Sequence, residues 1–98
     1  MKIERTATFK RNVKALIKKN YDIKKLETVL GLLINQETEI LKNQYKDHAL
    51  KGDLKSFREL HIEGDWLLVY QIKDNRLVLL LVATGSHDDV FRASKKYK

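Results

Sequence analysis

The first half of the chain predicts a short strand followed by two amphipathic helices. Polar and apolar residues alternate over residues 2–7, which is the two-residue period of a strand. Apolar residues then recur at helical spacing over residues 9–19, with Thr8 as the expected N-terminal cap. They recur again from Ile23 to about Gln36, in a second helix that Asp22 is expected to cap. The short break between these helices predicts an antiparallel helical hairpin. The apolar positions expected on its buried side are Phe9, Val13, Leu16, Ile17, Ile23, Leu26, Val29, Leu30 and Leu33.

The second half changes to the period of strands. Three strands are predicted over residues 56–63, 66–72 and 77–84, separated by turns at Gly64-Asp65 and Asp74-Asn75. Leu60 and Ile62 share one side of the first of these strands. The last strand is nearly all apolar, which is typical of a central strand covered on both faces. The order β-α-α-β-β-β predicts an α+β fold in which the helical hairpin lies on one face of a mostly antiparallel sheet.

Length and composition bound the architecture. Ninety-eight residues are enough for one domain, expected over residues 1–98, with a basic tail at residues 92–98. The longest apolar run, residues 77–83, is too short to span a bilayer, and the N-terminus lacks the apolar segment of a secretory signal. The absence of cysteine excludes disulfides, thiolate metal sites and a cysteine nucleophile. We therefore expect a cytoplasmic protein without a membrane partner.

The net charge of +7 is concentrated near the two ends of the chain. Residues 1–25 contain nine lysines and arginines against two acidic residues, and a second basic cluster closes the sequence with Arg92, Lys95, Lys96 and Lys98. Basic surfaces of this kind attract polyanions by long-range electrostatics. The charge therefore indicates either nucleic acid or an acidic protein partner, and it does not choose between them.

All three histidines lie in the second half, each close to a carboxylate in the sequence. The pairs are Asp47 with His48, His61 with Asp65, and His87 with Asp88 and Asp89. A single histidine is most often a surface or packing residue, but three in a basic, cysteine-free chain favour proton transfer near neutral pH. Their spacing matches no common metal-binding motif, and no serine-hydrolase elbow or phosphate-binding loop is present. We expect neither a metal nor another cofactor.

Three stretches, in order, resemble the YafQ branch of the RelE/ParE superfamily of toxins. They are residues 45–52, from Tyr45-Lys46-Asp47-His48 to Gly52; residues 57–70, from Phe57-Arg58-Glu59-Leu60-His61 to Tyr70; and residues 84–91, Thr84-Gly85-Ser86-His87-Asp88-Asp89-Val90-Phe91. The resemblance covers essentially the whole chain to Phe91. It implies the toxin of a type II toxin–antitoxin system, an endoribonuclease that cuts mRNA on translating ribosomes, held inactive by a DinJ- or RelB-like antitoxin.

The resemblance also implies which residues form the site. It places four side chains in the active site, His48, His61, Asp65 and His87, with Trp66 and Phe91 lining it. We further expect Lys46 and Arg58 to contact the RNA. Metal-free cleavage needs a base for the 2′-OH, an acid for the departing 5′-oxygen and positive charge near the phosphate. His87 is the first choice for the acid, and either Asp65 or His48 for the base. His61 would orient a partner or neutralise charge, while Trp66 and Phe91 would stack on bases or pack as ordinary apolar residues.

One position departs from the family pattern. The family usually has an arginine four residues before the last histidine, where this chain has Ala83. Weaker catalysis is expected unless Arg58, Lys46 or Lys51 supplies the charge, and a long side chain at position 83 is expected to have room to reach solvent. Two other functions stay open, a non-catalytic RNA- or ribosome-binding module and a ParE-like gyrase poison. The nuclease interpretation further predicts that the three histidines line one concave face opposite the helical hairpin.

Overall fold

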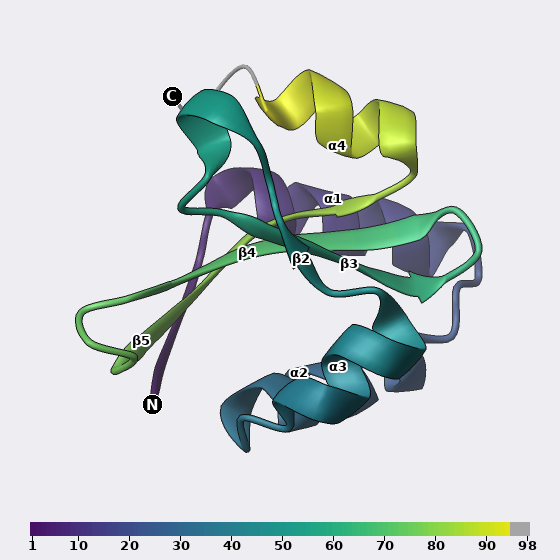
Figure 1. Cartoon of the computed structure of the whole chain (residues 1–98). Coiled ribbons are helices and arrows are strands. Elements are labelled where there is room, and N and C mark those ends of the chain that lie inside the picture. Colours follow the sequence, from purple (N-terminus) through teal and green to yellow (C-terminus); the bar gives the residue numbers. More distant parts are fainter. Residues whose placement is uncertain (95–98) are drawn as a thin grey trace.

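The computed structural model describes residues 1–94 and has the mixed α+β fold that the sequence predicts (Figure 1). The expected hairpin of the first two helices is wrong, because the second helix packs with a third helix, over residues 38–45, and the first packs on the sheet. Five strands form one sheet in the order β1-β5-β4-β3-β2. The elements follow one another as β1 (Lys2–Arg5), α1 (Ala7–Lys18), α2 (Ile23–Ile34), α3 (Thr38–Tyr45), β2 (His48–Ala49), a short 3-10 helix (Gly52–Leu54), β3 (Arg58–Glu63), β4 (Trp66–Lys73), β5 (Val78–Gly85) and α4 (His87–Ser94).

The sheet is antiparallel except where β1 pairs in parallel with β5. The alternation predicted for β3 is confirmed, since Leu60 and Ile62 are both buried. The prediction of a central apolar strand is also confirmed, because β5 lies between β1 and β4 and contributes side chains to cores on both faces. A β-bulge interrupts its pairing with β4, where Val69 pairs with Ala83 and Tyr70 with Leu81, so that Val82 has no direct partner.

Each face of the sheet has its own hydrophobic core. The first core combines side chains of α1, α2 and α3 with Leu60, Leu68, Leu79 and Leu81 of the strands. The second core lies on the other face, where Val90 of α4 packs with Leu67, Val69, Val82 and Ala83. Figure 1 shows α4 on one side of the sheet and α2 and α3 on the other. The α4 face is therefore less covered by helices than its opposite.

Several elements differ from the sequence prediction. The expected Thr8 cap is wrong: Thr6 caps α1, and its side chain accepts a hydrogen bond from the amide of Phe9 at 2.9 Å. The Asp22 cap of α2 is confirmed. Helices α3 and α4 and the two-residue strand β2 were not predicted. The expected basic tail begins within α4 at Arg92, and its lysines at positions 95, 96 and 98 lie outside the described residues.

The first turn of α4 is fixed by a reciprocal pair of hydrogen bonds. The Ser86 amide donates to Asp89 Oδ2 at 3.3 Å, and the Asp89 amide donates to Ser86 Oγ at 3.2 Å. Gly85 enters this turn with φ of 145°, a conformation that side chains rarely adopt. These contacts set the direction in which α4 leaves β5.

Over residues 1–94, no helix is long and apolar enough to cross a membrane.

We predict that Gly85→Ala destabilises the protein by about 1–3 kcal/mol, because it combines a strained backbone with a steric clash. A Cβ at this position would lie 2.9 Å from Asp89 Oδ2 and 3.1 Å from Asp89 Cβ, so the first turn of α4 would have to move. Gly31→Ala is the matched control, since Gly31 lies inside α2 with nothing within 4 Å of a new Cβ. This control should gain about 0.5–1 kcal/mol from helix propensity. Urea unfolding measures both changes, and a Gly85→Ala protein as stable as the wild type would contradict the account of this turn.

Candidate active site

The three histidines lie on the face of the sheet that carries α4, as the sequence predicted. His61 alternates along β3 with the buried Leu60 and Ile62, so it points to the opposite side from the first core. His48 of β2 pairs with Glu59 of β3, which points to the same side as His61. His87 begins α4, and its ring centroid lies 5.6 Å from that of His61. Residues 39 positions apart in the sequence thus share one face.

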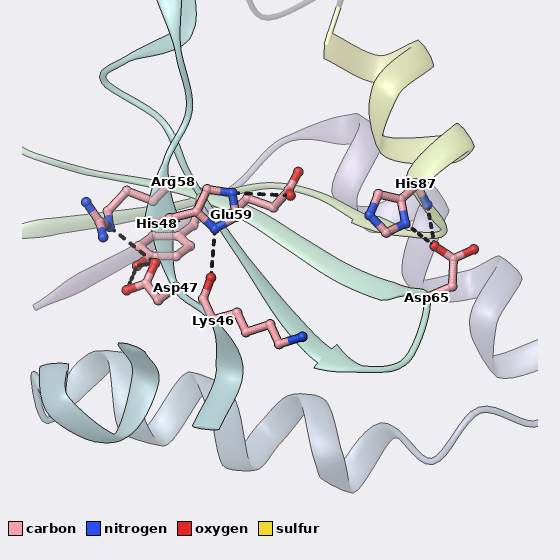
Figure 2. A network of polar contacts seen from close by, with 8 residues as sticks. Lys46, Asp47, His48, Arg58, Glu59, Asp65 and His87 are labelled. Atoms are coloured by element: carbon pink, nitrogen blue, oxygen red, sulfur yellow. Dashed lines mark hydrogen bonds and ion pairs between the residues drawn. The ribbon is translucent and has the colours of Figure 1, made fainter. Parts of the chain in front are cut away.

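Asp65 holds His87 through both its ring and its backbone. Asp65 lies in the turn between β3 and β4, and its Oδ1 accepts a hydrogen bond from the His87 amide at 3.0 Å and contacts His87 Nδ1 (Figure 2). The ring hydrogen bond, followed by the backbone hydrogen bond, lowers the pKa of Asp65 from its ordinary value. An ionised carboxylate at Nδ1 fixes the hydrogen of the ring there and leaves Nε2 directed elsewhere. Asp65 is therefore suited to orienting His87.

His48 makes contacts through both ring nitrogens. Its Nδ1 lies 2.7 Å from the carbonyl oxygen of Lys46, which can only accept a hydrogen bond, so Nδ1 carries a hydrogen. Its Nε2 lies 3.6 Å from Glu59 Oε1 (Figure 2). Lys46 ends α3 with a left-handed φ of 55°, which turns the chain from the helix into β2. Lys46 thus contributes its backbone to the site, and its side chain is exposed.

A cavity of about 400 Å³ opens between α4 and the segment that joins β2 to β3. Its polar lining comes from Glu59, His87 and Asp88, and its apolar lining comes from Leu50, Leu54, Val90 and Phe91. Phe91 is 69% exposed, so one face of this aromatic ring is accessible beside His87. Glu59 was not among the predicted site residues, although its position two residues before His61 on β3 places it on the same face. This volume can hold a group the size of a nucleobase.

Two of the residues expected to contact RNA lie away from this cavity. Trp66 is 2% exposed in the first core, where its Nε1 donates to Thr84 Oγ1 at 3.0 Å and its ring packs edge-on against Tyr21. The expectation that Trp66 stacks on bases is therefore wrong, because no face of its ring is accessible. Arg58 shares the alternation of Leu60 and points to the opposite face of the sheet, where its Nε bonds Asp47 Oδ1 at 3.2 Å. Arg58 is thus not positioned to contact a phosphate held at His87.

Comparison with known proteins decides the family. The family model for YafQ, a bacterial toxin of type II toxin–antitoxin systems, matches residues 1–92. The chain belongs to the YafQ family of bacterial type II toxins. It is 38% identical to the mRNA interferase toxin YafQ of Escherichia coli K12 over 89 residues, which are 91% of this chain and 94% of that protein.

Solved structures agree with this assignment of the YafQ fold. A metal-bound toxin from Helicobacter pylori superposes with a TM-score of 0.83 at 45% identity, covering 93% of this chain and 99% of that one. YafQ in the Escherichia coli DinJ–YafQ toxin–antitoxin complex superposes with a TM-score of 0.81 at 37% identity, covering 91% of this chain and 94% of that one.

Within residues 1–94 of the present chain, no three histidine, aspartate or glutamate side chains are grouped so that they could hold a metal ion.

Ala83 occupies a buried position in this YafQ toxin. It is 1% exposed and lies in the second core, where the apolar side chains around it include Leu67, Val69 and Val90. The expectation that a long side chain would have room there is wrong, because an arginine would have to displace core side chains or lift α4. Of the three cations considered as replacements, Arg58 lies on the other face. Lys51 is exposed between the cavity-lining residues Leu50 and Leu54, and Lys46 is exposed beside His48.

A partly buried polar network lies behind His48 on the first-core face. The Tyr70 hydroxyl lies 2.8 Å from each carboxylate oxygen of Asp47, whose side chain is 8% exposed and also bonds Arg58. Burial, followed by the charge of Asp47, raises the pKa of Tyr70 above its ordinary value of 10.0. The neutral hydroxyl is therefore the form that the folded protein favours. This network joins the segment before β2 to strands β3 and β4.

We predict that Tyr70→Phe destabilises the protein by about 1–3 kcal/mol, because it leaves a nearly buried carboxylate without its hydroxyl donor. The pKa of Tyr70 is raised on folding, so its contribution is complete below the unfolded value of 10.0 and is lost as pH rises beyond it. The difference in unfolding free energy between the wild type and Tyr70→Phe should thus be constant near neutral pH and shrink above pH 10. Chemical denaturation across this range measures it, and the same difference at every pH would contradict the network.

Proposed function

We propose that this chain is an endoribonuclease that cuts mRNA on the ribosome by metal-independent acid–base catalysis. The observation that carries the proposal is the Asp65–His87 pair, which lies against His61 at the edge of the cavity with exposed Phe91. The relative in Escherichia coli is named an mRNA interferase, which supports mRNA as the substrate. A histidine oriented by a carboxylate is suited to moving one proton in a defined direction.

The proposed reaction is attack of the RNA 2′-oxygen on the adjacent phosphorus. The bond from the 2′-oxygen to phosphorus forms while the bond from phosphorus to the 5′-oxygen breaks, which gives a 2′,3′-cyclic phosphate and a 5′-OH. His87 enters the step as the imidazolium paired with Asp65, donates its Nε2 proton to the departing 5′-oxygen and keeps the hydrogen on Nδ1. His48 is the better candidate to remove the 2′-OH proton, because Asp65 is occupied by His87 and its pKa is lowered. His61 lies close enough to His87 to help neutralise charge on the phosphate.

The cavity also supports a way to hold single-stranded RNA. Phe91 offers an exposed ring on which a base can stack, and stacking of this kind tolerates any base. Lys46 and Lys51 are exposed near the site and supply positive charge toward the RNA backbone. The lysines and arginines of α1, namely Lys10, Arg11, Lys14 and Lys18, are also exposed and add positive charge to the protein surface. This distribution suits a cytoplasmic toxin that works on ribosome-bound RNA.

Inhibition by a partner completes the proposed function. The Escherichia coli YafQ toxin is seen in complex with its antitoxin DinJ. We infer that a DinJ- or RelB-like antitoxin binds the present chain. The remaining alternative, a basic module that binds RNA without cutting it, shares the charged surface but does not need an oriented His87. Experiments on His87 therefore separate the enzyme from the module.

We predict that His87→Ala lowers cleavage of an RNA oligonucleotide by about 10²–10⁴-fold, because the 5′-oxygen loses its proton donor. A substrate with sulfur in place of the bridging 5′-oxygen has a leaving group that needs no proton. His87→Ala should recover most of its rate on this substrate. His48→Ala should not recover, because the 2′-OH proton must still be removed from this substrate. Rates are measured in single-turnover assays on programmed ribosomes. Equal losses for His87→Ala on both substrates would assign His87 another role, and binding of RNA without cleavage by the wild type would favour the binding module.

We predict that chelating agents leave the cleavage rate unchanged, because the proposed proton carriers are side chains. The Helicobacter pylori relative is described as metal-bound, so zinc and copper are added back in separate arms of the experiment. The product ends are read at the same time, and every arm should give a 2′,3′-cyclic phosphate and a 5′-OH. Loss of cleavage in chelator with recovery in one metal would overturn the metal-independent mechanism.

A further inference from the structure

The cavity beside His87 has the lining of a nucleobase site and not of a phosphate site. Within residues 1–94, its walls are apolar side chains and carboxylates, and none of its lining residues is a lysine or an arginine. Its acidic residues are Glu59 and Asp88. A phosphate among these carboxylates would be repelled, because like charges oppose each other strongly at short range. A base carries no charge and can pack against the apolar walls, with its phosphate outside the cavity near His87.

Helix α4 brings His87, Asp88 and Phe91 to the side that lines this cavity. Residue 91 follows Asp88 by three positions and His87 by four, which are the spacings of neighbours on one helix face. Side chains on a helix lean toward its N-terminus, so the ring of Phe91 extends over the turn that holds Asp88. A base that stacks on Phe91 therefore lies within reach of the Asp88 carboxylate.

The two aspartates in the first turn of α4 have different surroundings. Asp89 accepts a hydrogen bond from the Ser86 amide, and its Oδ1 lies 3.6 Å from Arg92. Arg92 donates only to the backbone carbonyl oxygen of Asp88, at 3.4 Å. Among the described residues, no hydrogen bond or ion pair engages the Asp88 carboxylate, and the residue is exposed. Asp89 thus stabilises the start of the helix, and the Asp88 carboxylate can accept hydrogen bonds from a ligand.

The proposed chemistry determines which nucleotide enters the cavity. His87 gives its proton to the 5′-oxygen of the departing nucleotide, which is the nucleotide 3′ to the cut. The sugar that carries this oxygen must therefore lie beside His87. Its base then reaches the cavity, because His87 forms part of the cavity wall.

A carboxylate distinguishes the bases by the groups on their Watson–Crick edges. Guanine carries two adjacent donors there, N1–H and the N2 amino group, and one carboxylate can accept both hydrogens. Adenine and cytosine have one amino group beside a ring nitrogen that only accepts. Uracil has one N–H between two carbonyl oxygens. In these three bases an acceptor faces the second carboxylate oxygen, and the two lone pairs repel each other.

We propose that Asp88 is a specificity-determining residue that selects guanine in the nucleotide 3′ to the cut. The proposal rests on the nuclease function proposed above and adds a base preference to it. Stacking on Phe91 contributes affinity for any base, so the selectivity comes from the carboxylate. An aspartate in the first turn of a helix also stabilises that helix through the helix dipole. That structural role alone would affect cleavage before every base to the same extent.

Single-turnover cleavage tests the preference on ribosome-bound mRNAs that differ only in the nucleotide 3′ to the cut. The wild type should cut about 10- to 100-fold faster before guanosine than before adenosine or before inosine, which lacks the N2 amino group. Asp88→Asn should lose this preference, because an amide offers one donor and one acceptor in place of two acceptors. It should also cut before adenosine faster than the wild type does, since adenine presents the complementary pair.

Asp74→Asn is the matched control for the loss of one charge. Asp74 lies in the turn between β4 and β5, away from α4 (Figure 1). Its φ of 54° is one that asparagine adopts readily, so this variant should fold and keep the wild-type preference. Equal wild-type rates before guanosine and inosine, or an unchanged preference in Asp88→Asn, would overturn the proposal. An equal loss on every substrate in Asp88→Asn would also overturn it, because Asp88 would then have only a structural role.

Binding of free nucleotides gives a readout that does not depend on cleavage. In proton–nitrogen NMR spectra, guanosine 5′-monophosphate should shift the amide signals of Asp88 and Phe91 at concentrations where adenosine 5′-monophosphate does not. Asp88→Asn should remove this difference. Equal shifts with both nucleotides, or none with either, would overturn the base site even if the protein cuts RNA. If only guanosine 5′-monophosphate shifts these signals and the wild type cleaves no RNA, the base site stands and the nuclease function fails.

Discussion

The packing of α4 on the second face of the sheet is the contact on which the site depends. Strands β4 and β5 are apolar on both faces, and Val90 of α4 packs on the second face against Leu67 and Val69 of β4. Burial of an apolar side chain of this size stabilises a fold by about 1.5–3 kcal/mol. The same helix begins at His87, so the hydrophobic contact determines where the imidazole lies. Gly85 and the Ser86–Asp89 pair then set the direction of the helix.

The polar contacts of the site have a different physical role. Asp65 and His87 are both exposed, and exposed ion pairs contribute little to stability because water screens them. Their value is orientation, since the carboxylate selects the nitrogen that carries the hydrogen. Tyr70 is buried and Asp47 is partly buried behind the same region, and their hydrogen bonds stabilise the strand pairing. The protein thus separates the interactions that hold the fold from those that direct the chemistry, with β3 between them.

The sequence was most informative where periodicity is strong. Apolar spacing predicted α1, α2 and the strands β3 to β5, because each of these elements buries regularly spaced side chains on one or both of its faces. Helix α3 was missed because only Leu41 among its residues is buried, so it has no apolar stripe. Strand β2 is too short and too exposed to produce a pattern. The start of helix α4 did carry a signal in the sequence, the Ser86-x-x-Asp89 capping pair.

The site residues also divide into those that the sequence predicts and those that only the folded structure reveals. The histidines and their carboxylates could be selected from residue type and family resemblance, and the structure brings them to one face. Arg58 was misplaced although alternation along β3 puts it on the same side as the buried Leu60. The surroundings of Ala83 were not predictable in this way, because the bulge at Val82 breaks the simple alternation of β5. Contacts across strands, such as that between His48 and Glu59, depend on register and require the folded chain.

The central claim is that the surface under α4 is an RNA-cleaving site that works through His87. The most direct measurement maps the 5′ ends of cellular mRNA by primer extension after brief expression of the wild type or His87→Ala, at matched protein levels. The account predicts new, discrete cuts within translated mRNA and arrest of growth for the wild type, and neither for His87→Ala. Identical cuts for the two proteins, or growth arrest without any cut, would contradict it.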